Sequence, residues 1–522
     1  MKGNSFFVAL PFAIATLVVG LLAINPYPLG VLHDDAVYAI LAKSLATGHG
    51  YRYLNLPGEP PATHFPPGYP LFLAALWRMS PGFPGNVVLF KMANAMWLVV
   101  GFGALVGLLR AQFRMSTLAA AALAFAVTAG VPMLFVSTLV LSETLFFGVA
   151  AVALLAVERV VARGTRPSDP LPIVAGLLCG AAALVRTPGI ALLGGAVIHL
   201  AWHRRFREIA TLCTASALLL IPWQVWTLEY GTAVPEPLRG AYGSYAGWLG
   251  DAVRQSGWTL VAKTIAVTSR QALDAVLAIL SPSRGATIGL LTMLIVAALV
   301  VVGLRAMSRV SLVLPAFLAF YVVLILIWPS PPARYVWGIW PIAILVPVLG
   351  VRALLDVRGV SLRARSARFA LCVLAIIPAL GYARFNIEGF RTRAWLRIPA
   401  QGGGMLRPLV TGIRDHTEPT AVVASTAEAA VYLFTGRKTV PVYSFTADEL
   451  FHGPTLDEQA AALSRIIAAY PVDAVVGSTP MHHLALQRIG TARRAAFVPV
   501  DSFPGSIIYA RASRDVEVVP RE

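Results

Sequence analysis

The sequence predicts a polytopic α-helical membrane protein of about 11–13 transmembrane helices, with a small C-terminal α/β domain outside the cytoplasm. Three observations support this fold class. Of the 522 residues, 57% are hydrophobic and only 13% are charged, which leaves too little polar surface to cover a soluble protein. Apolar runs of roughly 20 residues recur through residues 1–384. Residues 385–522 are more polar, and short strand-like and helix-like segments alternate there.

The first 384 residues contain about eleven segments with the composition of membrane-spanning helices. These segments lie at 6–25, 86–109, 117–136, 143–161, 171–186, 188–202, 209–228, 286–304, 310–328, 335–351 and 368–384. Pro188 interrupts the short pieces between 171 and 202, so the count can rise by one or two. We interpret the first run, Phe6 to Ile24, as an uncleaved span. It is nearly of bilayer length, and no clear cleavage site follows it.

Basic residues alternate along the connections in a way that predicts the orientation of the chain. With the N-terminus inside, the inner connections hold Arg110, Arg114, Arg159, Arg163, Arg166, Arg204, Arg205, Arg207, Arg305, Arg309 and the arginines of 352–368. The short outer turns hold almost none beyond Arg186 and Arg334. This pattern follows the positive-inside rule. It predicts a plasma (inner) membrane protein with residues 26–85, residues 229–285 and the C-terminal domain outside. The net charge of +17 therefore reflects orientation, and we expect no nucleic-acid partner.

The C-terminal residues 385–522 predict a small α/β domain of about 120 residues. Residues 421–425, 473–477 and 506–510 have the apolar, β-branched composition of buried strands. Residues 456–470 have helical periodicity with acidic residues early in the run.

Unusual polar residues gather on the predicted outer face. Asp34 and Asp35 follow the first span, Glu143 opens the fourth, Arg186 closes the fifth, and Arg334 and Tyr335 open the tenth. Ionisable residues at membrane depth are costly and tend to mark sites. A carboxylate can take a proton from an acceptor hydroxyl, and arginines can hold a phosphate. The set therefore fits a reaction on an anionic lipid.

Each of these residues also has a purely structural interpretation. Asp34 and Asp35 can form the acidic first turn of a helix over 35–47, and Glu143 can begin a helix. Arg186 and Arg334 can be arginines whose long side chains extend from span ends to the interface. His64 is most simply a loop residue. The aromatic residues of the second outer segment and the span before it fit an interfacial belt, with sugar or lipid stacking as the alternative for one or two: Trp223, Trp226, Tyr230, Tyr242, Tyr245 and Trp248.

Together, these motifs resemble the GT-C glycosyltransferases, in particular the branch with protein O-mannosyltransferases and lipid A aminoarabinose transferases. The resemblance covers nearly the whole chain and rests on short motifs in a shared order. They are 34–38 with Ala42 and Gly48, 66–70, Ser142-Glu143, 180–186 with Pro188, 221–223, and Arg334-Tyr335. One departure is Asp35, because the family often has glutamate at the second acid.

The resemblance implies a bundle with an extracytoplasmic active site and a polyprenyl-phosphate-linked sugar as donor. Transfer would be inverting, to an envelope glycan, lipid or protein. Asp34 would be the catalytic base, and Asp35 would orient the acceptor or assist. The resemblance assigns the donor phosphate to Arg334, Arg186 and Tyr335, with acceptor or supporting roles for Glu143, His64 and Tyr69.

The same sequence also indicates which cofactors and which other functions to expect. The sequence has no Walker A motif, dinucleotide fingerprint or HExxH motif. We expect no required metal, although an Asp pair has the chemistry to hold Mg²⁺. A lipid or solute transporter, or flippase, would also explain many spans. The helix interiors, however, hold few ionisable residues and show no repeat symmetry. A non-catalytic envelope scaffold is a further alternative.

Overall fold

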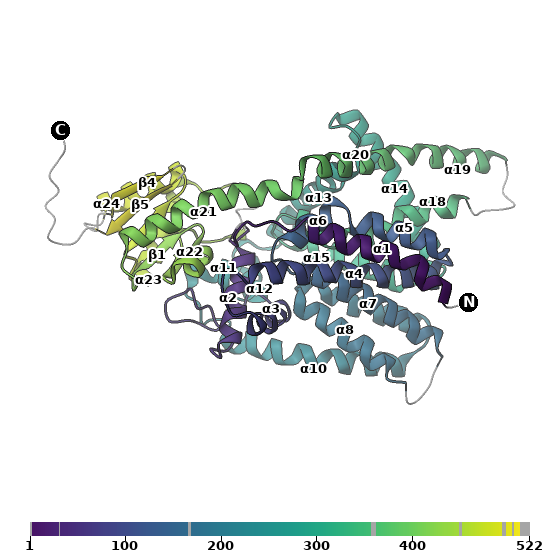
Figure 1. The fold of residues 1–522 in the computed structure, drawn as a ribbon, viewed down its shortest axis with the longest axis horizontal. Helices are drawn as coiled ribbons and strands as arrows, with labels where there is room; N and C mark the ends of the chain where they lie inside the picture. The colour runs from purple at the N-terminus through teal and green to yellow at the C-terminus, as the bar shows by residue number, and fades with distance from the viewer. Residues whose placement is uncertain are drawn as a thin grey trace.

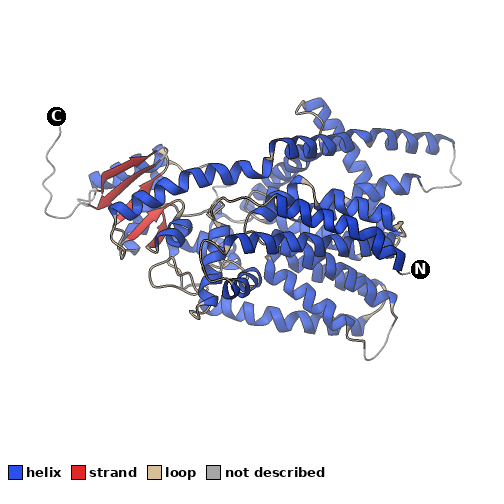
Figure 2. Cartoon of the chain, in the orientation of Figure 1, coloured by secondary structure: helices blue, strands red, loops and turns tan. Residues whose placement is uncertain are grey.

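A computed structural model describes residues 3–30, 32–164, 169–355, 362–447, 451–492, 497–503 and 506–511. The helices form an elongated bundle, and a small sheet domain lies beyond one end of it (Figures 1 and 2). The N-terminus lies toward the opposite end of the bundle (Figure 1). This architecture confirms the predicted helical membrane protein with a small C-terminal sheet domain.

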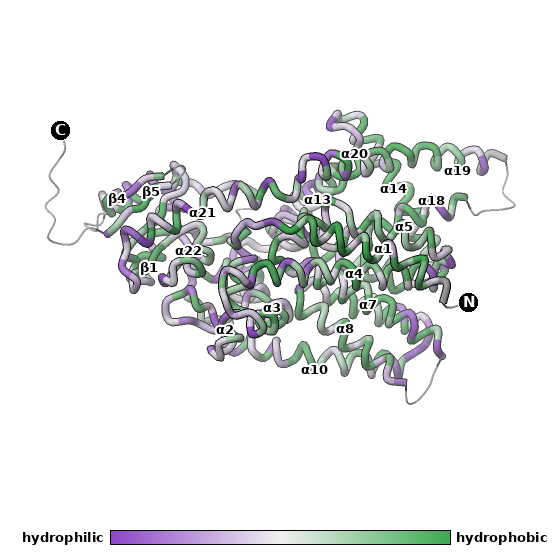
Figure 3. Tube along the Cα trace, viewed as in Figure 1, coloured by the Kyte–Doolittle hydropathy of each residue, from purple (hydrophilic) through white to green (hydrophobic). Residues whose placement is uncertain are grey.

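Six helical stretches among the described residues are long and apolar enough to cross a membrane. They are α1 (Gly3–Leu22), α4 (Val87–Phe113), α7 (Glu143–Ala162), α10 (Phe206–Tyr230), α14 (Ala286–Ser308) and the stretch Arg365–Thr392, which combines α19 (Leu362–Leu374) and α20 (Ile376–Thr392). The pair α5 (Thr117–Thr128) and α6 (Val131–Thr138), bent by 55°, raises this number to seven if it is one span. Figure 3 shows the apolar character of the bundle along its length.

Four shorter apolar helical stretches complete the set of predicted segments. They are α8 (Leu171–Val185), Thr187–Trp202 with η1 (Thr187–Gly189) and α9 (Ile190–Trp202), α15 (Val313–Ile327), and Trp340–Leu355 with α17 (Trp340–Ala343) and α18 (Leu345–Leu355). The six long stretches, the bent pair and these four coincide with the eleven segments that the sequence predicted. All four are shorter than the roughly 20 residues of a full crossing.

Helix α13 (Trp258–Leu280) was not predicted, since its sequence lies in the second outer segment. It packs against α15, α20 and α16 (Ala333–Gly338). The hydroxyl of Thr268 donates a hydrogen bond to the carbonyl of Leu326, near the end of α15. The helix therefore lies beside the end of the bundle that carries Arg334. Lys263, Arg270 and Asp274 make it too polar for a hydropathy search to find.

The C-terminal sheet has the strand order β2-β1-β3-β5-β4. Strand β1 (Val422–Ser425) pairs in parallel with β2 (Lys438–Pro441) and β3 (Ala474–Gly477), whereas β5 (Ser506–Arg511) is antiparallel to β3 and to β4 (Phe497–Phe503). Helices α22 (Glu428–Thr435) and α23 (Leu456–Ala469) make the crossovers, and α24 (Pro480–Ala492) follows β3. The predicted strands β1, β3 and β5 and helix α23 are confirmed. Strands β2 and β4 were not predicted. Strand β4 is exposed or half-buried throughout, whereas β2 is mostly buried but has only four residues, two of which are Lys438 and Pro441.

The sheet domain contacts the rest of the chain at several places, two of which position the site. Helix α21 (Arg397–His416) runs from the bundle to the sheet (Figure 1). Helix α20 continues past the predicted boundary at residue 384 and ends at Thr392. Helix α22 packs against α2 (Asp34–Ala46), the first helix after the first span. At this contact the backbones touch, because a Cβ on Gly30 would lie 2.2 Å from the Cβ of Ala430.

Candidate active site

The site begins in the tight turn that leads into α2. His33, just before the helix, has φ 56° and ψ −61°, the conformation of a γ-turn with positive φ. The Asp35 carboxylate closes this turn. Its Oδ2 accepts a hydrogen bond from the Gly30 amide at 3.0 Å, and its Oδ1 accepts from the Leu32 and Ala36 amides at 3.2 and 3.0 Å. The turn presents Asp34 to the cavity and directs Asp35 back into the protein.

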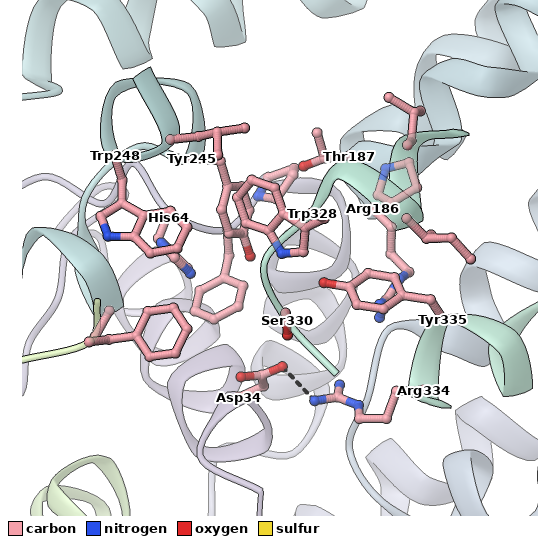
Figure 4. Close-up of a pocket in the computed structure, with 18 of the residues that line it drawn as sticks. Asp34, His64, Arg186, Thr187, Tyr245, Trp248, Trp328, Ser330, Arg334 and Tyr335 are labelled. Carbon is pink, nitrogen blue, oxygen red and sulfur yellow. Dashed lines mark hydrogen bonds and ion pairs between the residues drawn. The ribbon is translucent and has the colours of Figure 1, made fainter. Parts of the chain in front are cut away.

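A buried glutamate brings two arginines together beside Asp34. Glu143 opens α7 with a side chain that is 0% exposed, and its Oε1 lies 2.9 Å from Nη1 of Arg186 and 2.9 Å from Nη2 of Arg334. The Arg334 Nη1 also donates a hydrogen bond of 2.8 Å to Oδ2 of Asp34. Arg334 therefore bridges the two carboxylates, and Figure 4 shows its contact with Asp34. Because Glu143 is fully buried, water screens its two ion pairs only weakly.

The hydroxyl and aromatic groups around the arginines fix their direction. Arg186 Nη1 donates to the Ser142 hydroxyl at 3.0 Å, and that hydroxyl lies 3.2 Å from the hydroxyl of Tyr38. The guanidinium of Arg186 also lies over the Tyr335 ring, 5.1 Å from its centre. A guanidinium held by a carboxylate, a hydroxyl and an aromatic face has one orientation, and Arg186 lines the cavity described next.

These groups line one cavity of about 500 Å³. Asp34 and Arg334 face each other at its base, with Arg186 and Tyr335 on one side (Figure 4). The other walls come from distant elements: His64, Leu324, Ile327, Trp328, Ser330 and, from the C-terminal domain, Tyr443 and Phe445. The cavity thus joins a charged end to apolar walls.

Aromatic residues form the wall opposite the arginines (Figure 4). The rings of His64 and Tyr245 have centres 4.1 Å apart, and Trp248 stacks on Phe445 at 5.3 Å. The His64 Nδ1–H donates a hydrogen bond of 2.8 Å to the Gly243 carbonyl. Burial lowers the pKa of His64 to about 4, so this imidazole is neutral at physiological pH.

The ionisation of Asp34 is set by two cations. Burial alone would raise its pKa, but the charge of Arg334, followed by hydrogen bonding and charge from His33, holds the pKa of this carboxyl well below its usual range. His33 Nδ1 lies 3.9 Å from Asp34 Oδ1, and His33 Nε2 lies 2.8 Å from Oε1 of Glu428. Burial would lower the pKa of His33, yet Glu428 and Asp34 outweigh it and raise the pKa to about 10. Asp34 is therefore a carboxylate beside an imidazolium at neutral pH.

The structure brings most of the predicted site residues together. Asp34, His64, Arg186, Arg334 and Tyr335 line the cavity. Glu143 lies directly behind the arginines as their shared counter-ion.

Asp35 and Tyr69 lie outside the lining. Tyr69 is fully buried, where its hydroxyl donates to Asn94 Oδ1 at 3.2 Å and its ring packs on Tyr38 at 5.0 Å. The Asp35 carboxylate accepts hydrogen bonds from backbone amides of the turn before α2.

Several lining residues were not predicted as site residues. Tyr245 and Trp248 were interpreted as an interfacial belt, with stacking as the alternative, because an aromatic residue near a membrane face fits both. His33 precedes the predicted Asp pair, but a single histidine does not form a recognisable sequence motif. Trp328, Tyr443 and Phe445 gave no signal, since only the folded chain brings them to the cavity.

The described residues form no cluster of three or more His, Cys, Asp or Glu side chains that could hold a metal ion. The nearest partners of Asp34 are the cationic groups of Arg334 and His33. These groups repel a divalent cation, so the donor set around Asp34 does not fit one.

Comparison with known proteins identifies similarity in structure but not in sequence. No family model and no curated protein matches the sequence. The crystal structure of ArnT from Cupriavidus metallidurans, bound to undecaprenyl phosphate, has a TM-score of 0.54 at 14% identity. That match covers 98% of this chain and 99% of ArnT.

The archaeal oligosaccharyltransferase AglB from Archaeoglobus fulgidus, in complex with an inhibitory peptide and a dolichol-phosphate, has a TM-score of 0.52 at 13% identity. That match covers 98% of this chain and 75% of AglB. A crystal structure of the Archaeoglobus fulgidus oligosaccharyltransferase with Zn and sulfate has a TM-score of 0.54 at 15% identity, over 97% of this chain and 74% of that one. At these identities the likeness establishes a shared fold, and function has to be argued from the site.

Proposed function

Because the chain has the GT-C fold, we propose that it is an inverting membrane glycosyltransferase. Its donor would be a sugar on a polyprenyl-phosphate carrier, and its acceptor a hydroxyl of an envelope glycan, lipid or protein. One observation carries the proposal. Asp34, Arg186 and Arg334 meet at the charged end of a cavity whose other walls are apolar and aromatic. Such a cavity suits a lipid phosphate joined to a sugar, and the fold supports it.

Donor binding engages the two arginines. Glu143 holds both guanidiniums toward the cavity, where they can bind the phosphate through several charge-assisted hydrogen bonds. A phosphate at Arg334 competes with Asp34 for the same guanidinium. The pKa of Asp34 then rises from its depressed position, because its main stabilising charge is shared. Donor binding thus makes Asp34 a stronger base.

The transfer step is a single displacement. The acceptor oxygen forms a bond to the anomeric carbon as the bond between that carbon and the phosphate oxygen breaks. The acceptor proton passes to the Asp34 carboxylate, and the electron pair of the broken bond stays on the phosphate oxygen. Arg334 and Arg186 stabilise the charge that develops there. Attack from the face opposite the leaving phosphate inverts the anomeric configuration.

The apolar and aromatic walls would hold the rest of the donor and the acceptor. Leu324 and Ile327 of the α15 end present an aliphatic surface for the lipid chain. Tyr245 and Trp248 present ring faces on which a sugar can stack. We assign neither a sugar nor a lipid length, because these walls are not specific to one.

We propose that the cavity opens on the outer side of the plasma membrane. The opposite ends of α4 and α14 form a separate hollow lined by Arg114, Arg309 and Arg352. Arginines favour the cytoplasmic side, so this hollow would face inward. The N-terminus would then be cytoplasmic and the C-terminal domain periplasmic or extracellular.

The first experiment measures sugar transfer in membranes from a panel of radiolabelled polyprenyl-phosphate sugars. Wild type is compared with Asp34→Asn and with Asp457→Asn, an exposed carboxylate of the C-terminal domain. We expect transfer from one donor, its loss in Asp34→Asn, its retention in Asp457→Asn, and full activity in EDTA. Transfer that survives in Asp34→Asn would contradict the assignment of the base. No transfer from any donor, together with uptake in proteoliposomes, would favour a transporter.

A further inference from the structure

A buried carboxylate of the C-terminal domain contacts the catalytic turn. Glu428 is the first residue of α22, and its side chain is 0% exposed. Its Oε1 lies 2.8 Å from His33 Nε2 and accepts a hydrogen bond of 3.0 Å from the Tyr242 hydroxyl. The transfer steps described above make no use of Glu428. Its contact with His33 joins residues 395 positions apart in the chain.

Burial of this carboxylate requires a cation. Removing a charge from water is unfavourable unless a partner of opposite charge compensates it. Among the described residues, His33 is the basic side chain within ion-pair distance of Glu428. The remaining oxygen, Oε2, makes no hydrogen bond to a described residue. Glu428 therefore depends on the His33 imidazolium, and the His33 proton depends on Glu428.

His33 transmits this contact to Asp34 through its other ring nitrogen. Nδ1 faces Asp34 Oδ1 at 3.9 Å, while the ring edge packs against Tyr242 at 5.9 Å between centres. The neighbouring His64 is neutral, because burial lowers its pKa to about 4. The positive φ of His33 is strained and persists only where the surroundings hold it. Here Glu428 on one side and Asp35 on the other hold the turn.

We propose that Glu428 is a positioning residue for the transfer reaction, through which the docked C-terminal domain holds His33 as an imidazolium against Asp34. The proposal rests on the proposed function. Arg334 and His33 flank Asp34. When the donor phosphate draws Arg334 toward itself, His33 is the cation that stays beside Asp34. It then fixes the direction of the carboxylate that receives the acceptor proton.

The test uses Glu428→Gln, which keeps the shape of the side chain and removes its charge. The matched control is Glu418→Gln, an exposed carboxylate of the same domain. We expect kcat to fall about 10- to 100-fold in Glu428→Gln, as for a misplaced catalytic group. The KM for the donor stays unchanged, because both arginines remain. Glu418→Gln behaves as wild type.

A second readout follows the protonation of His33 without relying on activity. The exchange rate of the imidazole C2–H, measured by mass spectrometry, gives the pKa of each histidine. We expect the pKa of His33 near 10 in wild type. In Glu428→Gln it should move toward 6.5, the ordinary histidine value. The residual kcat of this variant should then decline as the pH rises through the new pKa of His33, whereas wild type shows no such step at neutral pH.

The double variant Glu428→Gln with His33→Gln separates positioning from folding. If Glu428 acts through His33, its substitution costs little more once His33 is replaced. An equal further loss would overturn the proposal, as would a His33 pKa that stays near 10 in Glu428→Gln. Absence of transfer in wild type with every donor would remove the proposed function itself. The exchange measurement would then still show whether Glu428 holds the His33 proton.

Discussion

Asp34 and Asp35 are adjacent in sequence, and their carboxylates have opposite surroundings. Asp34 lines the cavity and pairs with Arg334 at 2.8 Å. Asp35 is 1% exposed and accepts backbone amides of the turn. Successive residues of a helix point in directions about 100° apart. The sequence does not show which side of the helix faces the cavity, so it could not show which of the two carboxylates lines it. The turn at His33 sets this direction, and it depends on the docked C-terminal domain.

We expect Asp35→Asn to lower stability more than Asp34→Asn does. An asparagine can accept through one oxygen only, so at least one amide of the Gly30–Ala36 turn loses its partner. An unsatisfied buried group costs about 1–3 kcal/mol. The apparent Tm of each purified variant in detergent measures the difference. An Asp35→Asn protein that melts like wild type would show that this turn does not depend on the carboxylate.

The raised pKa of His33 predicts how stability depends on pH. The pKa rises from 6.5 to about 10 on folding, so the folded state binds a proton that the unfolded chain releases. The contribution of His33 to the free energy of unfolding is complete below pH 6.5 and is lost as the pH rises toward 10. Between pH 7 and pH 10, the Tm of wild type should therefore fall more steeply than that of His33→Gln. Parallel curves for the two proteins would contradict the pairing with Glu428.

At the scale of elements, hydropathy located the helices of the bundle but not the helix beside the site. All eleven predicted segments are helical. Helix α13 escaped detection because one side of it packs on the bundle and the other carries charge, so its mean hydropathy is modest. Strand β4 was not predicted because few of its residues are buried. Strand β2 is mostly buried, but its four residues, Lys438–Pro441, are too few to give a strand pattern.

The contact between α22 and the turn before α2 gives a prediction at this scale. In Gly30→Ala the new Cβ would lie 2.2 Å from that of Ala430, and Gly30 also has φ +96°. Gly58 has φ +78° and open space around it, so Gly58→Ala adds the backbone strain without the clash. We expect Gly30→Ala to lose most transfer activity and Gly58→Ala to keep it. Equal activity in the two variants would show that α22 need not pack closely on the turn.

At the scale of the whole molecule, two sets of arginines lie at opposite ends of the bundle. Arg186 and Arg334 line the candidate active-site cavity, and Arg114, Arg309 and Arg352 line the other hollow. The alternation of basic connections predicted this separation, because each span carries the chain from one end to the other. The sequence could not predict that Tyr443, Phe445 and Glu428 approach the site. Contacts between residues hundreds of positions apart follow from the docking of two domains.

Labelling of single cysteines tests the orientation. Cys179, Cys213 and Cys372 are the cysteines of the chain and are first replaced by serine or alanine. Ser256→Cys, exposed at the end of α12 (Tyr245–Ser256), would lie on the site end. Ala111→Cys would lie beside the arginine hollow. A membrane-impermeant maleimide should label the first in intact cells and the second only after permeabilisation. The reverse pattern would invert the topology.

The contact between Glu428 and His33 joins two residues that are synthesised at different times. The ribosome synthesises Asp34, Arg186 and Arg334 well before Glu428 emerges. Under the proposed function, a nascent bundle would hold the groups for the carrier phosphate before it has the residue that orients the base. Folding of the C-terminal domain would then be the last step in the assembly of the site.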